Sequence, residues 1–124
     1  MNKLALGTVQ FGLDYGLSNV REKVSFEEAI KILNFSKVNN IDTIDTASFY
    51  GNSEKLLGEI GVNDFHIITK TAPIKLGVSN VIKSFHQSLS NLNTSTLDGL
   101  LIHNINEVKN KKFDILYKEL LKLK

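Results

Sequence analysis

The chain has 124 residues, of which 42% are hydrophobic and 23% are charged, and its formal net charge is +2. This composition is typical of one soluble globular domain and excludes the collagen-like, mucin-like and disordered classes. The nearly balanced charge argues against nucleic acid or a membrane surface as a partner, and the absence of cysteine excludes disulfides, thiolate zinc sites and thiol nucleophiles.

Apolar runs alternate along the chain with segments of helical period, which predicts βα units around a parallel sheet. Residues 4–8 form the first apolar run and predict a strand, followed by a loop that contains Gly12 and Gly16. Ser25 followed three residues later by Glu28 is a capping-box pattern, which marks the start of a helix. We therefore predict a helix over residues 26–39 that the pair Asn39-Asn40 closes.

The same alternation continues to the end of the chain. The further elements that we predict are a strand at residues 41–46, a short helix that Asn52 or Ser53 caps and that ends near Gly61, a strand at 65–70, a helix from about Ser79, a strand at 97–102 and a lysine-rich amphipathic helix from Phe113. Together they make four βα units.

Three of these strands end on an ionisable residue, which a buried parallel strand does not need. Asp45 lies near the end of the second strand, Lys70 ends the third and His103 follows the fourth. Neighbouring strands lie about 4.8 Å apart, and α/β folds carry their chemistry at the carboxyl ends of the strands. Tyr50 lies on the loop directly after the second strand, so we expect all four side chains in one pocket.

The chemistry of these four groups is complementary. A phenol has an ordinary pKa of about 10, and a lysine ammonium beside it favours the phenolate. A carboxylate beside the lysine keeps the ammonium charged and oriented, and a histidine donates a hydrogen bond to a carbonyl oxygen. The group therefore predicts a tyrosine acid aimed at a carbonyl, with the hydride coming from a cofactor. Taken singly, each residue is more often structural than catalytic.

The sequence resembles a known family, the aldo-keto reductases. The resemblance lies in four runs, of which the second is the most specific: GTVQFG at residues 7–12, DTASFYGNSE at 45–54, ITK at 68–70 and LIHN at 101–104. It implies an α/β fold of the (β/α)8 TIM-barrel type, of which this chain holds about the first four βα units, a half barrel. The opening GTVQFGLDYG at residues 7–16 is similar to members that act in sugar metabolism.

The resemblance also implies roles for individual residues. Tyr50 would donate the proton, Lys70 would lower the pKa of that phenol, Asp45 would pair with Lys70, and His103 would orient the carbonyl. Gly7, Thr8 and Asp45 would lie near the nicotinamide and ribose of NADPH, the usual hydride source of the family. Its substrates are small-molecule aldehydes, ketones and sugars, and no metal is implied.

A complete (β/α)8 barrel takes roughly 250 residues, so residues 1–124 are expected to form a single partial domain, truncated in the fourth helix. In the family most NADPH contacts lie in the other half, so the resemblance implies that an isolated fragment would be inactive. Four strands would also leave two open sheet edges. The alternative is therefore a non-catalytic half barrel that self-associates or docks on a partner, such as a complementary barrel half.

Two further expectations concern location and other sites. The first twelve residues lack a long apolar segment and no stretch approaches the ~18 apolar residues of a membrane span, which predicts a cytoplasmic protein. His66 and His86 make no convincing zinc set with His103. The lysines of the final helix indicate a solvated face rather than a nucleic-acid site.

Overall fold

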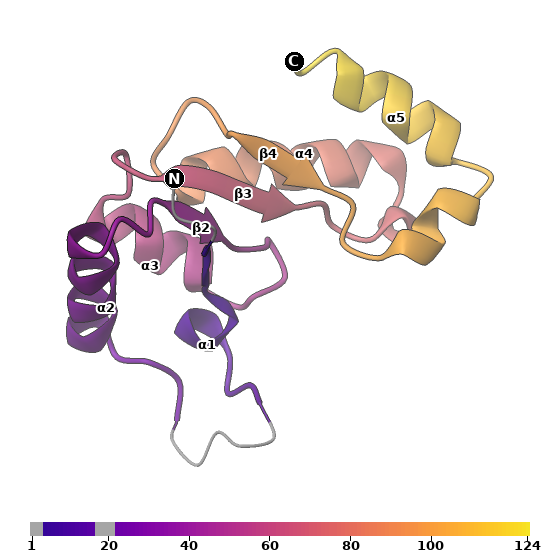
Figure 1. The fold of residues 1–124 in the computed structure, drawn as a ribbon. Helices are drawn as coiled ribbons and strands as arrows, with labels where there is room; N and C mark the ends of the chain where they lie inside the picture. Colours follow the sequence, from indigo (N-terminus) through magenta and orange to yellow (C-terminus); the bar gives the residue numbers. More distant parts are fainter. Residues whose placement is uncertain (1–3, 17–21) are drawn as a thin grey trace.

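The computed structural model describes residues 4–16 and 22–124, which form one parallel sheet with helices beside it (Figure 1). Its four strands are hydrogen-bonded in chain order, and all pairs are parallel. The strands are β1 (Leu6–Gly7), β2 (Thr43–Asp45), β3 (His66–Lys70) and β4 (Gly99–Leu101). Each is shorter than the apolar run that predicted it, because the ends of those runs already belong to the connecting loops.

Five α-helices accompany the strands, and two short 3₁₀ turns precede the fourth and fifth. The helices are α1 (Val9–Gly12), α2 (Phe26–Val38), α3 (Ser53–Ile60), α4 (Val78–Asn91) and α5 (Phe113–Leu121), and the 3₁₀ turns are η1 (Ile74–Leu76) and η2 (Ile105–Lys109). The alternation of strands and helices follows the expectation, with α1, η1 and η2 as additions inside the predicted loops.

The ends of α2 are set by the residues that predicted them. The Ser25 hydroxyl accepts a hydrogen bond from the amide of Glu28 at 3.2 Å, as a helix N-cap requires. At the other end, Asn40 adopts a φ of +57°, the left-handed conformation that asparagine tolerates and that stops the helix. Gly61 has a φ of +91° just after α3, where a side chain would be strained.

In the described part of the chain the helices pack through two apolar clusters, of which the larger also contains residues of the strands. The larger cluster lies under β2 and β3, with Ile44, Leu57 and Leu33 at its centre. The smaller cluster joins η1, α4 and α5 and is formed by Ile74, Val81 and Leu116. Through Leu116, α5 belongs to this second cluster, and it lies apart from the larger core (Figure 1).

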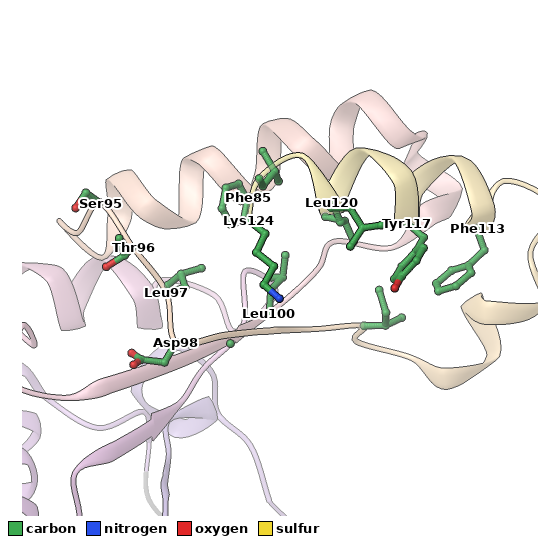
Figure 2. Close-up of a pocket in the computed structure, with 14 residues that line it drawn as sticks. Phe85, Ser95, Thr96, Leu97, Asp98, Leu100, Phe113, Tyr117, Leu120 and Lys124 are labelled. Carbon is green, nitrogen blue, oxygen red and sulfur yellow. The ribbon is translucent and has the colours of Figure 1, made fainter.

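A groove of about 550 Å³ lies between β4, Phe85 in the middle of α4, and α5 (Figure 2). Leu97 and Leu100 line one wall, and Phe113, Tyr117 and Leu120 line the opposite one. β4 is also one edge of the sheet in the described part of the chain. Within residues 4–16 and 22–124, no helix is long and apolar enough to cross a membrane.

Candidate active site at the carboxyl ends of the strands

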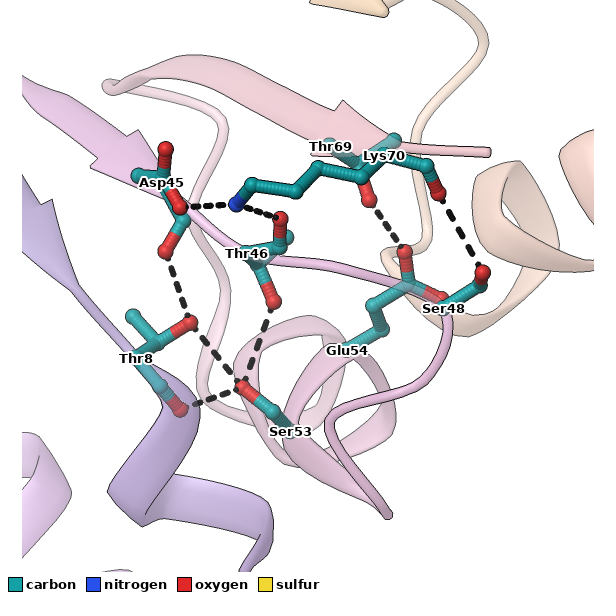
Figure 3. A network of polar contacts seen from close by, with 8 residues as sticks. All are labelled: Thr8, Asp45, Thr46, Ser48, Ser53, Glu54, Thr69 and Lys70. Carbon is teal, nitrogen blue, oxygen red and sulfur yellow. Dashed lines mark hydrogen bonds and ion pairs between the residues drawn. The ribbon is translucent and has the colours of Figure 1, made fainter. Parts of the chain in front are cut away.

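Asp45 and Lys70 are the last residues of two neighbouring strands, and their side chains meet (Figure 3). Lys70 Nζ donates to Asp45 Oδ1 and, over 2.9 Å, to the backbone carbonyl of Thr46. The lysine side chain is only 15% exposed, whereas the aspartate is 36% exposed. A charge-assisted hydrogen bond offsets the cost of withdrawing the ammonium from water, so the pair is fixed in place.

Tyr50 and His103 complete the group that the sequence predicted. Lys70 Nζ lies over the face of the Tyr50 ring, 4.9 Å from its centroid, a cation–π contact. The rings of Tyr50 and His103 are 5.9 Å apart and nearly perpendicular, at 81°. His103 follows β4, and its backbone amide bonds the hydroxyl of Thr71 at 3.4 Å. The structure therefore brings Asp45, Tyr50, Lys70 and His103 together.

Tyr50 lies on a tight loop that packs against α1. Gly12 and the loop touch so closely that a Cβ on Gly12 would lie 1.6 Å from the Tyr50 carbonyl oxygen. Gly51 has a φ of +57°, and a Cβ there would lie 2.3 Å from the carbonyl oxygen of Gly12. The two glycines thus allow the segments at residues 7–12 and 45–54 to pack in direct backbone contact.

Gly7 and Thr8, the two other predicted binding residues, occupy different surroundings. Gly7 pairs with Asp45 across the sheet, and a Cβ built on it would meet nothing within 4 Å, so the space beside it is open. Thr8 is completely buried, and both its amide and its hydroxyl bond the backbone carbonyl of Asp45, at 3.0 and 3.1 Å. Its side chain supports β2 and is not part of the open surface.

A layer of buried polar side chains lies beneath the group, and the sequence predictions gave it no role (Figure 3). Ser53, the first residue of α3, bonds Thr8 of the β1 end and Thr46 of the β2 end. Glu54, which is only 4% exposed, accepts a 2.7 Å hydrogen bond from the Thr69 hydroxyl in β3. The sequence does carry a signal for this layer. Thr46 stands beside Asp45 and Thr69 beside Lys70, and the pair Ser53-Glu54 starts the next helix.

The arrangement suits proton transfer at an open surface. It places a phenol beside a fixed ammonium and an imidazole, and the phenol and imidazole both remain accessible to solvent. Such a combination can protonate an oxygen atom of a bound molecule and hold that atom in place. In the described part of the chain, no three His, Asp or Glu side chains are grouped as a metal site requires.

Comparison with known families identifies the chain as a family member. The model of the aldo/keto reductase family matches residues 3–124, which is nearly the whole chain. A comparison with the curated proteins finds no matching relative.

Comparison with solved structures gives many matches, several of which are aldo-keto reductases. A Pseudomonas aeruginosa structure described as an aldo-keto reductase is 25% identical, with a TM-score of 0.77 over 95% of this chain and 50% of its own. A thermostable aldo-keto reductase in complex with the inhibitor epalrestat is also 25% identical, with a TM-score of 0.65 over 94% and 47%.

A third structure, an aldo-keto reductase from Bombyx mori in complex with NADP, is 23% identical. Its TM-score is 0.59 over 80% of this chain and 33% of its own, which shows a shared fold. The chain therefore spans about half the length, or less, of these solved structures. Its four parallel strands and their helices correspond to the first half of a (β/α)8 barrel.

Proposed function

Because the chain belongs to the aldo/keto reductase family, we propose that it is the amino-terminal part of an NADPH-dependent enzyme that reduces an aldehyde, ketone or sugar carbonyl. The observation that carries the proposal is the convergence of Asp45, Tyr50, Lys70 and His103 from three neighbouring strand ends. Four separate positions of the sequence supply these groups, and the residue types and their spacing predict that the four side chains share one pocket.

In this proposal Tyr50 donates its hydroxyl proton to the substrate oxygen. The Lys70 ammonium next to the ring favours the phenolate that remains, by attraction of opposite charges. Asp45 and the Thr46 carbonyl hold that ammonium in place, so the stabilising charge is present before the reaction begins. The exposed imidazole of His103, at the edge of the Tyr50 ring, is placed to donate a hydrogen bond to the same oxygen.

The residues present fit the nicotinamide end of NADPH. The space beside Gly7 is open, and the carboxylate of Asp45 remains partly exposed beside it. When bound, the reduced nicotinamide supplies a hydride to the carbonyl carbon. Together with the Tyr50 proton this converts the carbonyl to an alcohol, and Tyr50 then regains a proton from solvent. The 124 residues contain no Gly-rich phosphate fingerprint of the G-x-G-x-x-G kind.

The test is the substitution Tyr50→Phe in the chain or in any assembly of it that reduces a carbonyl. Removal of a general acid is expected to lower kcat by about 10²- to 10⁴-fold, measured as NADPH consumption with an aldehyde. Tyr117→Phe, on an exposed side chain of α5, is the matched control and should leave the rate unchanged. Equal turnover of the Tyr50→Phe variant and the native chain removes the proton-donor assignment.

The groove beside β4 favours a second candidate function, that of a half-barrel interaction protein. Its apolar walls lie next to a sheet edge, and such a surface is suited to binding protein. The occupant would be a second copy of the chain or a complementary barrel half. The two functions differ in one observable, because only the first predicts saturable quenching of NADPH fluorescence by the protein.

A further inference from the structure

Ser53 is a completely buried hydroxyl at the meeting point of two strand ends and a helix. Its Oγ lies 3.0 Å from both the carbonyl oxygen and the hydroxyl of Thr8, and 3.3 Å from the hydroxyl of Thr46. A serine at a helix start commonly bonds its own helix. Here Asn52 is the N-cap residue and makes no side-chain cap, and the Ser53 hydroxyl is used on the strands instead.

The direction of these hydrogen bonds follows from the fact that each hydroxyl has one proton. The Thr8 hydroxyl donates to the Asp45 carbonyl, so its oxygen can only accept from Ser53. Ser53 uses its proton on Thr8, so it accepts from Thr46. The result is one continuous chain of donors from Thr46 through Ser53 and Thr8 to Asp45.

This series of hydrogen bonds ends at the two residues that hold the Lys70 ammonium. The side chain of Asp45 and the backbone carbonyl of Thr46 are the acceptors of Lys70 Nζ. Ser53 contacts Thr46 directly and reaches Asp45 through Thr8. Its hydroxyl therefore ties the Thr46 side chain and, through Thr8, the Asp45 backbone to the start of α3, and so supports the two residues that hold the ammonium over the Tyr50 ring.

We propose that Ser53 is a positioning residue of the proposed active site, which sets the Lys70 ammonium against Tyr50 by joining Thr8 and Thr46 beneath it. The proposal rests on the proposed function for its catalytic meaning, and on contacts within the chain for its geometry. Glu54, the next residue, anchors the same helix start to Thr69 of β3, so that α3 is tied to three successive strand ends. Loss of the Ser53 hydroxyl leaves the Thr46 donor without its buried acceptor.

The experiment compares two buried serines in the 124-residue chain. In Ser53→Ala, the NMR signals of the Tyr50 ring, assigned as those that Tyr50→Phe removes, are expected to move, because this ring contacts the Lys70 ammonium. Ser88→Ala is the matched control: Ser88 is 2% exposed and bonds only its own helix, at the carbonyl of Ser84. It should lower the free energy of unfolding without moving those ring signals.

Ser53→Cys provides a second, nearly isosteric variant with a weak hydrogen-bond donor, and should move the same signals by a smaller amount. Ring signals that stay in place in both Ser53 variants overturn the proposal. Loss of the folded state in both variants, with Ser88→Ala still folded, also overturns it, because Ser53 then serves the fold as a whole. The outcome is separate from that of Tyr50→Phe. If the ring signals move in the Ser53 variants while Tyr50→Phe turns over as fast as the native chain, the proton-donor assignment fails and the positioning of Lys70 by Ser53 stands.

Discussion

Gly12 determines directly where the Tyr50 loop can lie. A methyl group at this position would overlap the Tyr50 carbonyl oxygen and approach the backbone nitrogen of Ser53 to 2.7 Å. Neither atom belongs to a flexible side chain, so the backbone of the loop or of α1 must move. Overpacking of this kind typically costs about 1–3 kcal/mol of stability.

We therefore expect Gly12→Ala to lower the free energy of unfolding by about 1–3 kcal/mol, measured by urea titration. Gly7→Ala is the matched control, because a Cβ at Gly7 meets open space, and its unfolding midpoint should stay near that of the native chain. Two variants of equal stability would contradict the packing of the Tyr50 loop against α1.

At the residue scale, the sequence was most informative where chemistry and strand ends coincide. Asp45, Lys70 and His103 were singled out because a buried strand does not need an ionisable end, and that reasoning uses only local pattern. The roles of Ser53 and Thr8 could not be derived in this way, because a hydroxyl has several local partners and only the fold selects among them. Thr8 illustrates the difference: its hydroxyl is buried and bonds the Asp45 carbonyl, a contact that no local pattern indicates, while its place near a cofactor stays a prediction.

At the scale of elements, β3 and β4 are joined at their amino-terminal ends by an ion pair. His66 Nδ1 and Asp98 Oδ1 are 2.8 Å apart, and the other oxygen of Asp98 accepts from the amide of Ile67 at 2.8 Å. The hydrogen bond and then the charge of Asp98 raise the pKa of His66, with a smaller effect of Asp42. The hydrogen bonds of His66 and Ile67 lower the pKa of Asp98.

These shifts give the pair a defined pH window. A raised pKa of His66 means that its contribution is complete below the ordinary value of 6.5 and is lost as the pH rises through the raised value. A lowered pKa of Asp98 means that its contribution is present above 3.8 and is lost as the pH falls through the lowered value. The pair therefore stabilises the protein most between pH 3.8 and 6.5.

We expect the native chain to lose stability as the pH rises through the raised pKa of His66. The His66→Gln variant should lose less stability over the same pH range. The measurement is the urea midpoint across a pH series, with His86→Gln as the control on an exposed histidine of α4. The control should retain the native pH dependence. Parallel curves for the native chain and His66→Gln would show that the contact with Asp98 adds nothing to stability.

The elements themselves follow closely from local pattern. The helix α2 was predicted to within one residue because Ser25, Glu28 and Asn40 act on their own neighbours in the chain. The turns α1, η1 and η2 were not predicted, since each has three to five residues and depends on what packs beside it. Gly12 shows this dependence: it ends α1 and is pressed against a loop from another βα unit.

At the scale of the whole molecule, the described sheet has two edges, β1 and β4, and the β4 edge borders the apolar groove. Tyr117 and Leu121 of α5 line that groove and are 53% and 52% exposed. A sheet edge with apolar side chains beside it pairs readily with other strands. We therefore expect the 124-residue chain to form species larger than a monomer at micromolar concentration, measured by analytical ultracentrifugation.

Leu121→Glu should shift these species toward the monomer, because it places a charge in the groove. Leu76→Glu is the matched control, since Leu76 is similarly exposed, at 45%, but does not line the groove. A native chain that sediments as a single monomer and unfolds cooperatively would count against the interaction function.

The order of the strands has a consequence for synthesis. Each strand pairs only with the strands made just before and just after it, so every ladder can close as soon as the next unit leaves the ribosome. Aspartate, tyrosine, lysine and histidine then join the cluster one after another, from Asp45 to His103. Synthesis therefore delivers the four groups in the order in which their strands neighbour one another in the sheet, with the imidazole last.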